Sequence, residues 1–513
     1  MIDDSAISFS SLWERSVARR PDASFLVFET SNGTLREWTY SEFDAVVARC
    51  ASALAVRGVV SGASVSLALT NSPAFVAAWL AALRLGAWIV PSDPMSRSQE
   101  LVEHLARTRA RVGIYSVRRR SEYLEAAGTM PIIEVDEDDC ELTILGRDRV
   151  DGPSTAEPHD RAAVMFTSGT TGRPKGVVIT QANYSFAGQV MAQAAGLGAN
   201  HRQLVVLPLF HANAQYYSFA SAIAVGSSVA LVHTFSASQF LRQAKRLDAT
   251  HASLFAAPIR MVLARGSEPV PGLALRHCWY AMNLSEAQYE QFAALIGCKP
   301  RQLYGMTETI PAVLSDSLDA PRYDSMGFVT AGCEVEIQGS DGARTVDGEV
   351  GEIVVRGVPG TTLFDCYLDD PEVTARSFRG GWFLTGDRAS RDSDGRHWFE
   401  GRRADVLKVS GENVSIVEVE QVLSSHPGLL EAAVIGRPDP VRDEVPVAFV
   451  VANDPAAPPS VASLHEWCSK RLSKSKLPRE FTFVDELPRT SVGKIRKFML
   501  REHQPSQAAG GGE

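Results

Sequence analysis

The sequence has little of what marks secreted, membrane-spanning or nucleic-acid-binding proteins. Its 513 residues include seven cysteines, an odd number without metal-like spacing, which is typical of reduced thiols in a cytoplasmic protein. The most apolar segment, 74–90, is interrupted by Arg84 and Gly86 and is too short to span a membrane. The first residues are polar and acidic, which argues against a secretion signal. A net charge of −9 over this length gives no reason to expect nucleic acid as a partner.

The chain is too long for one ordinary hydrophobic core, so we expect at least two domains. Residues 8–20 and 41–55 have the apolar spacing of helices, and Ser41 is expected to cap the second. Short apolar runs such as 65–69 and 228–232 alternate with helical segments. This alternation predicts a parallel, doubly wound sheet.

We therefore predict an α/β protein with a large N-terminal domain at residues 1–402. That domain is expected to contain two βα sheets with helices and, from about Gly332, a small β-barrel-like subdomain. A compact α+β domain is predicted at residues 403–503, and residues 504–513 are expected to form a disordered tail.

A stretch rich in glycine and hydroxyl groups runs from residue 164 to residue 176. The apolar run 162–166 enters it and the apolar run 177–180 leaves it, which predicts a strand, a loop and a second strand. Its glycines let backbone N–H groups approach a ligand closely, and its hydroxyls and lysine add donors and positive charge. Such a loop suits a polyphosphate. It differs from the common P-loop because Pro174 precedes Lys175 and a strand, instead of a helix, follows. For the tetrapeptide Gly-Thr-Thr-Gly alone, a flexible surface hairpin is an equal alternative.

Polar residues follow several later predicted strands, as His211, Asn283 and the segment 304–309 illustrate. Ligands of open α/β sheets bind beyond the carboxyl ends of strands, so these residues can converge. The segment 304–309, Tyr-Gly-Met-Thr-Glu-Thr, combines an aromatic ring, hydroxyls and a carboxylate. A nucleotide site needs a ring beside the base, a donor for phosphate and a carboxylate for Mg²⁺.

These segments resemble the signatures of the adenylate-forming superfamily, which includes acyl-CoA synthetases, nonribosomal-peptide adenylation domains and beetle luciferases. Two further strings carry the resemblance: Gly-Trp-Phe-Leu-Thr-Gly-Asp at 381–387, and Leu-Pro-Arg-Thr-Ser-Val-Gly-Lys-Ile-Arg at 487–496. The matches occur in the family's order over nearly the whole chain. The resemblance implies that a carboxylate attacks the α-phosphate of MgATP, and that a thiol then displaces AMP from the acyl-adenylate.

The resemblance also implies roles for individual residues. Tyr304 stacks near adenine, Asp387 accepts the ribose hydroxyls, Glu308 holds Mg²⁺ and Lys494 bridges the carboxylate and the α-phosphate. For a buried aspartate in a turn, an Asx cap is the alternative role. The implied ATP- or AMP-binding residues are Thr167, Ser168, Gly169, Thr170, Thr171, Gly172, Lys175, Tyr304, Gly305, Thr307, Asp387 and Arg402. The implied catalytic residues are Lys494, Thr307, Glu308 and His211, with Glu308 as the metal ligand.

In the second half-reaction, the resemblance implies that the small C-terminal domain swings about a connector and presents another face. The residues implied along the thiol path of CoA are Lys408, Ser410, Gly411 and Glu412. Family members commonly carry Asp or Lys at the hinge position, where this chain has Ala404, so other contacts would set the swing.

The acid-binding pocket departs from that of amino-acid-activating relatives. The segment 210–214, Phe-His-Ala-Asn-Ala, lacks the carboxylate that pairs with an ammonium group, which disfavours an α-amino acid. His211 is implied to gate the pocket, with a structural histidine as the alternative. The implied acyl-pocket residues are His211, Asn213, Ala214, Ala281, Met282, Asn283 and Met306.

The strings at 280–285, 357–364 and 442–444 most resemble the crotonobetaine/carnitine-CoA ligase branch of the superfamily. A quaternary ammonium substrate needs an aromatic or acidic cage. Tyr216 and Tyr217 are candidates for one, although a core or pocket-wall role is favoured, so carnitine is not inferred. The residues near Met282 suit an apolar acid of unusual shape, for example one from secondary metabolism.

Three functions stay open at this point. The favoured one is an AMP-forming acyl-CoA synthetase that uses ATP, Mg²⁺ and CoA on a small carboxylic acid. The second is a stand-alone enzyme that loads the activated acid onto a carrier protein's phosphopantetheine. The third is a non-catalytic nucleotide-binding protein, which the joint presence of the signature residues disfavours. We expect no nucleic-acid partner and no integral membrane association. The sequence does not determine the oligomeric state and is compatible with a homodimer.

Overall fold

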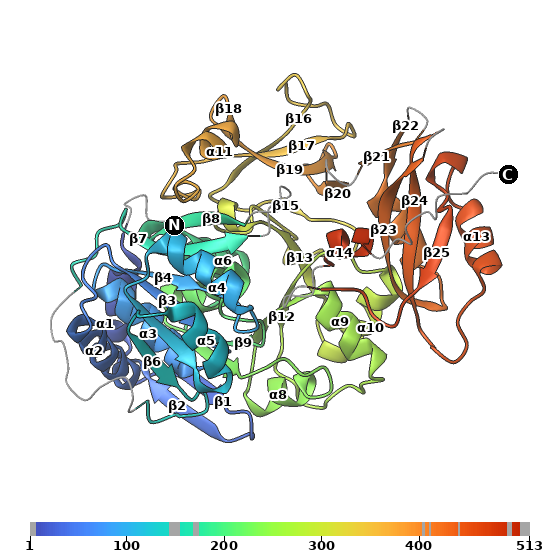
Figure 1. Cartoon of the computed structure of the whole chain (residues 1–513). Helices are drawn as coiled ribbons and strands as arrows, with labels where there is room; N and C mark the ends of the chain where they lie inside the picture. The colour runs from blue at the N-terminus through green and yellow to red at the C-terminus, as the bar shows by residue number, and fades with distance from the viewer. Residues whose placement is uncertain are drawn as a thin grey trace.

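The computed structural model describes residues 7–142, 154–167, 174–402, 406–409, 412–439, 442–489 and 495–502. Figure 1 shows the chain up to about residue 329 gathered around two large sheets, with the small sheet of residues 334–402 above them. The C-terminal elements from residue 406 onward, in orange-red and red, form a smaller body to one side. The predicted α/β class, with a larger N-terminal and a smaller C-terminal part, is confirmed.

The first large sheet carries the predicted phosphate loop. Its strands in the described residues, in spatial order, are β6 (Ile132–Val135), β5 (Val112–Ser116), β3 (Ser64–Ala68), β4 (Trp88–Pro91), β7 (Arg161–Thr167) and β8 (Lys175–Thr180). Neighbouring strands are parallel except for the antiparallel pair β7–β8, which flanks the loop. The predicted strand–loop–strand arrangement is therefore a hairpin at one edge of a parallel sheet.

The second large sheet carries the other strand-end residues. Its strands in the described residues, in spatial order, are β15 (Phe328–Val329), β14 (Leu314–Ser315), β13 (Arg301–Tyr304), β12 (His277–Ala281), β11 (His251–Phe255), β9 (Arg202–Val205), β10 (Ser228–Val232), β1 (Ser24–Glu29) and β2 (Leu35–Thr39). The strands from β13 to β1 run parallel, which brings their carboxyl ends to one edge.

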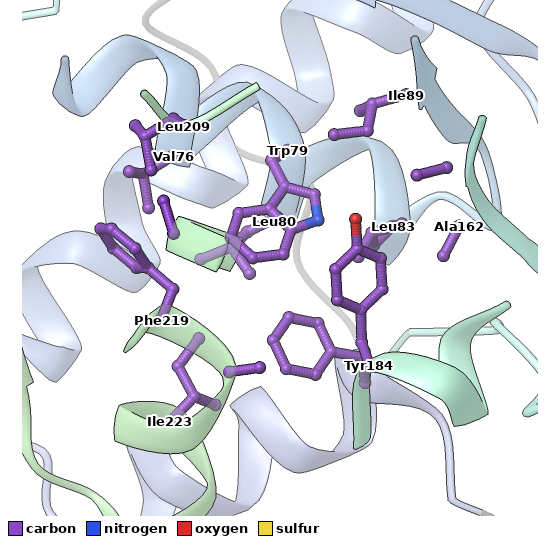
Figure 2. Packing of buried hydrophobic residues seen from close by; sticks show 14 of the residues in the cluster. Val76, Trp79, Leu80, Leu83, Ile89, Ala162, Tyr184, Leu209, Phe219 and Ile223 are labelled. Atoms are coloured by element: carbon purple, nitrogen blue, oxygen red, sulfur yellow. The ribbon is translucent and has the colours of Figure 1, made fainter. Parts of the chain in front are cut away.

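Helices fill the space between the two sheets. Apolar side chains of both sheets share one core with α1 (Phe9–Arg19), α2 (Tyr40–Val56), α3 (Pro73–Arg84), α6 (Gln181–Ala194), η3 (Asn213–Ala220) and α7 (Ser221–Val225). Figure 2 shows Trp79 of α3 beside Tyr184 of α6, with Phe219 of η3 nearby. Their ring centroids lie 5.2 and 6.2 Å from that of Trp79. Burial of these aromatic rings dominates the hydrophobic stabilisation of this layer.

The outer faces are covered separately. The first sheet packs on α4 (Ser98–Thr108) and α5 (Arg120–Ala127). The second packs on α8 (Phe240–Arg246), α9 (Ala256–Ala264) and α10 (Glu286–Ile296). None of the helices in the described ranges is long and apolar enough to cross a membrane.

Two smaller sheets complete the described chain. The first has the order β16 (Glu334–Gln338), β17 (Gly351–Arg356), β19 (Trp382–Arg391) and β18 (Phe378–Arg379), with β20 (His397–Arg402) also paired to β19, and α11 (Pro371–Arg376) lies beside it. The C-terminal sheet has the order β22 (Glu412–Ser415), β21 (Val406–Val409), β24 (Asp443–Ala452) and β23 (Leu429–Asp439), with β25 (Glu480–Phe483) paired to β24. The C-terminal helices are α12 (Ile416–Ser424), α13 (Val461–Ser469) and α14 (Lys497–Glu502). The predicted barrel-like subdomain corresponds to β16–β20, whose described pairings form an open antiparallel sheet.

One local feature differs from the sequence-based expectations, and a second was not predicted. Thr39, not Ser41, caps α2: its hydroxyl accepts a hydrogen bond from the N–H of Glu42 at 3.2 Å, and the Glu42 carboxylate accepts one from the N–H of Thr39 at 2.8 Å. This reciprocal capping box satisfies two donors at once, whereas Ser41 lies inside the first turn. The segment Asn213–Ala220 is a π-helix, a form that is frequent at functional sites.

Candidate active site

The second large sheet reverses its winding between β9 and β11. From β9 the chain adds β10 on one side and then β11 on the other. Ligands of open α/β sheets bind beyond the carboxyl ends of the strands at such a point, and we call this region the crevice. The loop after β9 is fixed from the other large sheet by Asn71, whose amide donates to the carbonyl of Leu207 at 3.1 Å and accepts from the N–H of Leu209 at 2.8 Å. This loop leads to His211, so the crevice brings the two sheets' strand-end residues together.

Tyr304, Asp387 and Arg402 meet in one hydrogen-bonded group. The Tyr304 hydroxyl donates to one oxygen of Asp387 at 2.8 Å, and Nε of Arg402 lies 2.9 Å from the other oxygen. Asp387 and Arg402 are opposite each other on β19 and β20, and Asp387 is 4% exposed. Burial, and then the Asp387 charge, hold the pKa of Tyr304 well above its usual value, so the phenol stays a donor. Each carboxylate oxygen keeps a lone pair for a ligand hydroxyl.

Glu308, Tyr367 and Lys175 form a second group beside the first. The Tyr367 hydroxyl donates to the buried carboxylate of Glu308 at 2.9 Å, and Nζ of Lys175 lies 4.6 Å from the centre of the Tyr367 ring. Burial, and then the Glu308 charge, raise the pKa of Tyr367. The Glu308 carboxylate and the Lys175 ammonium thus both contact Tyr367, one at its hydroxyl and the other over its ring. A carboxylate and a cation held close together can receive a metal-bound polyphosphate.

The loop between these two groups is tightly packed and strained. A Cβ atom added to Gly305 would lie 2.9 Å from Cα of Ala312 and 3.0 Å from the Tyr217 hydroxyl, so only glycine fits there. Ile310 has a backbone φ of +70°. Residues with β-branched side chains, such as isoleucine, rarely adopt this conformation. Strained backbone of this kind clusters at functional sites. Thr307 and Glu308 lie on the short 3₁₀ helix η4 (Thr307–Thr309) between these two positions.

The predicted phosphate loop is described at its two flanks. Thr167 ends β7 and Lys175 begins β8, and the two are opposite each other in the antiparallel register. The predicted loop residues that lie outside the described part of the chain are Ser168, Gly169, Thr170, Thr171 and Gly172.

Helix α4 holds both flanks of this loop. The Arg107 guanidinium donates to the carbonyl of Pro174 at 2.6 Å and lies 4.9 Å from the centre of the Phe166 ring. One turn earlier, the His104 ring stacks on Phe166 with centroids 4.0 Å apart and an interplanar angle of 3°. Burial lowers the pKa of His104 to about 4, so the ring is neutral near pH 7 and stacks without a charge. Motif reading missed both residues because α4 looks like an ordinary amphipathic helix.

The predicted acid-binding residues lie at the crevice but differ in exposure. His211 packs on Phe210 with ring centroids 4.2 Å apart, and Asn213 and Ala214 begin η3 and are buried. Ala281 ends β12, and Asn283 follows two residues later. Met282 is 39% exposed and has a φ of +74°, a backbone that favours glycine. Met306 packs against the core between the sheets.

The two tyrosines considered for an aromatic cage are both buried. The Tyr216 hydroxyl lies 3.9 Å from the sulfur of Met165, and the Tyr217 hydroxyl faces Gly305. Both belong to the hydrophobic core between the sheets. Their placement agrees with the core or pocket-wall role favoured from the sequence.

The remaining predicted residues belong to the C-terminal part. Lys408 is on β21 and Glu412 is on β22, two strands that pair with each other. Four predicted residues lie outside the described ranges: Ala404, Ser410, Gly411 and Lys494. Arg489 and Ile495, which flank Lys494, form an antiparallel bridge. Burial, and then the charge of Arg260 on α9, lower the pKa of Arg489 to about 10.

Comparison with known protein families matches two parts of the chain. Residues 13–368 match the family described as AMP-binding enzyme, and residues 418–494 match the AMP-binding enzyme C-terminal domain. Among characterised relatives, the crotonobetaine/carnitine–CoA ligase of Salmonella enteritidis is 32% identical over 507 residues, covering 96% of this chain and 98% of the relative.

Solved structures give a consistent result. The anthranilate CoA ligase AuaEII in complex with anthranoyl-AMP aligns with a TM-score of 0.87 at 26% identity, covering 98% of both chains. ATP-bound MatB from Rhodopseudomonas palustris aligns with a TM-score of 0.87 at 25% identity, covering 96% of this chain and 98% of that one.

Proposed function

This chain belongs to the AMP-binding enzyme family, and from that premise we propose how its site activates a carboxylic acid with MgATP and passes the acyl group to CoA. The reaction class predicted from the sequence, an AMP-forming acid–thiol ligase of the acyl-CoA synthetase type, is confirmed by the relatives. The observation that carries the residue assignments is the pair of adjoining groups Tyr304–Asp387–Arg402 and Glu308–Tyr367–Lys175.

The first group is suited to the nucleoside of ATP. Asp387 is buried and held from both sides by Tyr304 and Arg402, so its oxygens are fixed for two neighbouring ribose hydroxyls. Thr307 lies on the adjoining strained loop, and we assign its hydroxyl as a donor to the α-phosphate. Arg402 adds positive charge next to the sugar and phosphate.

The second group is suited to the polyphosphate and its metal. Mg²⁺ usually takes one or two protein carboxylates and fills its other positions with phosphate oxygens and water. Glu308 supplies such a carboxylate, and Lys175 supplies a cation for the β- and γ-phosphates. When bound, Mg²⁺ neutralises negative charge on the phosphates and orients them. The chain's own contribution is to fix the carboxylate through Tyr367 before the substrate arrives.

The reaction consists of two displacements, the first at the α-phosphorus and the second at the acyl carbon. A carboxylate oxygen of the acid forms a bond to the α-phosphorus, and the bond to pyrophosphate breaks. The thiol of CoA gives its proton to solvent, its sulfur bonds to the acyl carbon, and AMP leaves with the former carboxylate oxygen. Lys494 serves the first step by stabilising charge on the reacting oxygens. Four residues are proposed to line the path of the thiol in the second step, after the C-terminal part turns about Ala404: Lys408, Ser410, Gly411 and Glu412.

The acid is received at the crevice after β9 and β12. His211 is proposed to gate it. The other residues assigned to the acid site are Asn213, Ala214, Ala281, Met282, Asn283 and Met306. No carboxylate occurs in the segment 210–214, so the site has no partner there for the ammonium group of an α-amino acid.

The test is mass spectrometry of products from enzyme, MgATP and a panel of short, long, aromatic, polycyclic and betaine acids, with and without CoA. We expect acyl-CoA and AMP from at least one acid. Acyl-adenylate that forms but does not react with CoA would instead make a carrier protein the acceptor. Failure of all these acids to give adenylate or a thermal shift would count against the proposed acid site.

We predict that Arg107 is a positioning residue for ATP because it joins both flanks of the phosphate loop. Replacing Arg107 by Met should raise KM for MgATP roughly 10-fold, the value of one charge-assisted hydrogen bond, with a smaller change in kcat. The thioester half-reaction from supplied acyl-adenylate should be unchanged, because it does not use the β- and γ-phosphates. Steady-state kinetics of each half-reaction measures the two effects.

Arg161→Met provides the matched control. Arg161 makes the same kind of cation–π contact with Trp88, at 4.9 Å, but at the opposite end of β7 from the loop. An equal rise in KM in this control, or an equal loss of both half-reactions in the Arg107 variant, would show that Arg107 only stabilises the fold.

A further inference from the structure

Several buried polar atoms beneath η3 have no hydrogen-bond partner among the described residues. They are the hydroxyl of Ser253, the indole nitrogen of Trp279, Nδ1 of His277 and the amide oxygen of Asn213. These residues are 4%, 1%, 3% and 6% exposed, respectively. A buried polar group without a partner is rare and needs an explanation, such as a bound molecule or water.

Three of these atoms belong to one patch of the second large sheet. Ser253 on β11 and Trp279 on β12 are opposite each other in the parallel register, and His277 is two residues before Trp279 on the same face. The rings of His277 and Trp279 have centroids 4.5 Å apart. We call Ser253, His277 and Trp279 the donor patch.

The donor patch faces the interior between the two sheets. Trp279 packs in the same hydrophobic cluster as Tyr216, Tyr217 and Phe219 of η3, whereas its strand neighbours Cys278 and Tyr280 pack on the opposite face. Asn213, which begins η3, carries the fourth unpaired atom. The patch therefore lies under the π-helix that follows His211.

The same sheet face leads directly to the proposed acid site. Ala281 lies two residues beyond Trp279 on β12, so both side chains point to one side of the sheet. At about 3.3 Å per residue, the Trp279 position is roughly 7 Å deeper than Ala281. The donor patch thus continues, deeper in the protein, the sheet face on which Ala281 lies.

The N–H and O–H groups of the donor patch favour a ligand atom that accepts hydrogen bonds. Nη1 of Arg301 lies 2.9 Å from Nε2 of His277 and can only donate, so Nε2 accepts and the ring's proton is on Nδ1. Trp279 likewise can only donate, and Ser253 adds a hydroxyl. The buried Arg301 guanidinium lies 4.3 Å from the centre of a Trp279 ring and adds positive potential.

We propose that the donor patch is a specificity subsite that binds an oxygen acceptor, a carbonyl or carboxylate, at the far end of the acid. This inference rests on the proposed function and narrows its substrate class. It replaces the expectation, based on the residues near Met282, of an apolar acid of unusual shape. An acid with an alkyl end would leave these buried donors without hydrogen bonds. The free-energy cost of the missing hydrogen bonds disfavours such an acid strongly.

The test compares acids of equal length that differ only at the far end: alkanoic acids, oxo-acids and dicarboxylic acids. The rate of pyrophosphate exchange gives kcat/KM for each. The wild-type enzyme should favour an acceptor-bearing acid over its alkyl match by roughly 10- to 100-fold. The oxo and dicarboxylic arms show whether the acceptor is neutral or charged. Trp279→Phe should reduce the preference to within about threefold, and Ser253→Ala should reduce it partly.

Two matched controls separate this effect from a loss of packing. Trp79→Phe removes an equally buried, unpaired indole N–H on α3, and Ser185→Ala removes a buried, unpaired hydroxyl on α6. Both should keep the wild-type preference. Ser253→Ala, the smaller change, remains informative if Trp279→Phe fails to fold.

The outcomes distinguish the two proposals. Equal use of alkyl and acceptor-bearing acids, or equal effects of the Trp279 and Trp79 variants, would overturn the subsite and leave ordered water as the partner of these donors. Acyl-CoA would still form in that case, so the proposed function would stand. Absence of adenylate and of ligand-induced thermal stabilisation with every acid would contradict the proposed function itself.

Discussion

Replacing Glu308 by Gln is expected to reduce kcat/KM for adenylate formation by roughly 10²- to 10³-fold. The amide keeps the size of the carboxylate and can still accept the hydrogen bond from Tyr367, so the fold should be preserved. It removes the negative charge that we propose holds Mg²⁺. Pyrophosphate exchange at several Mg²⁺ concentrations measures the loss, which should become smaller as Mg²⁺ rises.

Tyr367→Phe is the informative companion variant. It removes the hydrogen bond to Glu308 but leaves the carboxylate, so we expect a loss of about 10-fold or less. If the phenylalanine variant loses as much activity as the glutamine variant, or if Mg²⁺ concentration has no effect on either, then Glu308 supports the fold and does not hold the metal.

Replacing Lys494 by Ala is expected to remove adenylate formation, by roughly 10²- to 10³-fold, and to leave thioester formation from supplied acyl-adenylate nearly unchanged. Charge builds on the phosphorus oxygens only while pyrophosphate leaves, and this cation is proposed to act at that moment. Lys494 lies outside the described residues, so the expectation rests on the signature string and on its flanks, Arg489 and Ile495. Separate assays of the two half-reactions measure the difference.

Lys497→Ala controls for the loss of a lysine from the same part of the chain. Its ammonium pairs with Glu420 at 2.9 Å within the C-terminal part. Both half-reactions should therefore stay near wild type in this control. Equal loss of the two half-reactions in the Lys494 variant would refute the idea that the C-terminal part changes position between them.

Most regular elements could be predicted because buried parallel strands are short apolar runs with clear ends. The run 228–232, for example, is β10 with the same bounds. The prediction that Ser41 caps α2 was wrong. Thr39 and Ser41 are both good capping residues, and only the reciprocal contact with Glu42 decides between them. The π-helix at Asn213–Ala220 could not be foreseen, because its hydrogen-bond pattern depends on packing between the sheets.

The residues of the candidate site also differ in how well they could be predicted from the sequence. Residues in signature strings, such as Glu308 and Asp387, could be named from sequence because strand ends and glycine-rich loops are local patterns. Tyr367 and Arg107 could not, since each contacts the site from an element far away in the chain. The donor patch was also invisible in sequence: Ser253 and Trp279 look like ordinary strand residues until their burial leaves polar atoms unpaired.

The resemblance itself is confirmed, including its crotonobetaine/carnitine–CoA ligase branch. The roles of individual residues, the domain boundaries at 402 and 503, and the acceptor thiol stay predictions. The recognition of the acid's far end by Ser253, His277 and Trp279 also stays a proposal.

The most direct test of the central claim follows an oxygen atom. An acid that the panel shows to be a substrate is labelled with ¹⁸O in its carboxyl group and incubated with enzyme, MgATP and CoA. The account predicts AMP that carries one heavy oxygen, because the carboxylate oxygen bonds to the α-phosphorus and stays there when the thiol displaces AMP. Acyl-CoA formed together with unlabelled AMP, or with ADP, would contradict an acyl-adenylate intermediate.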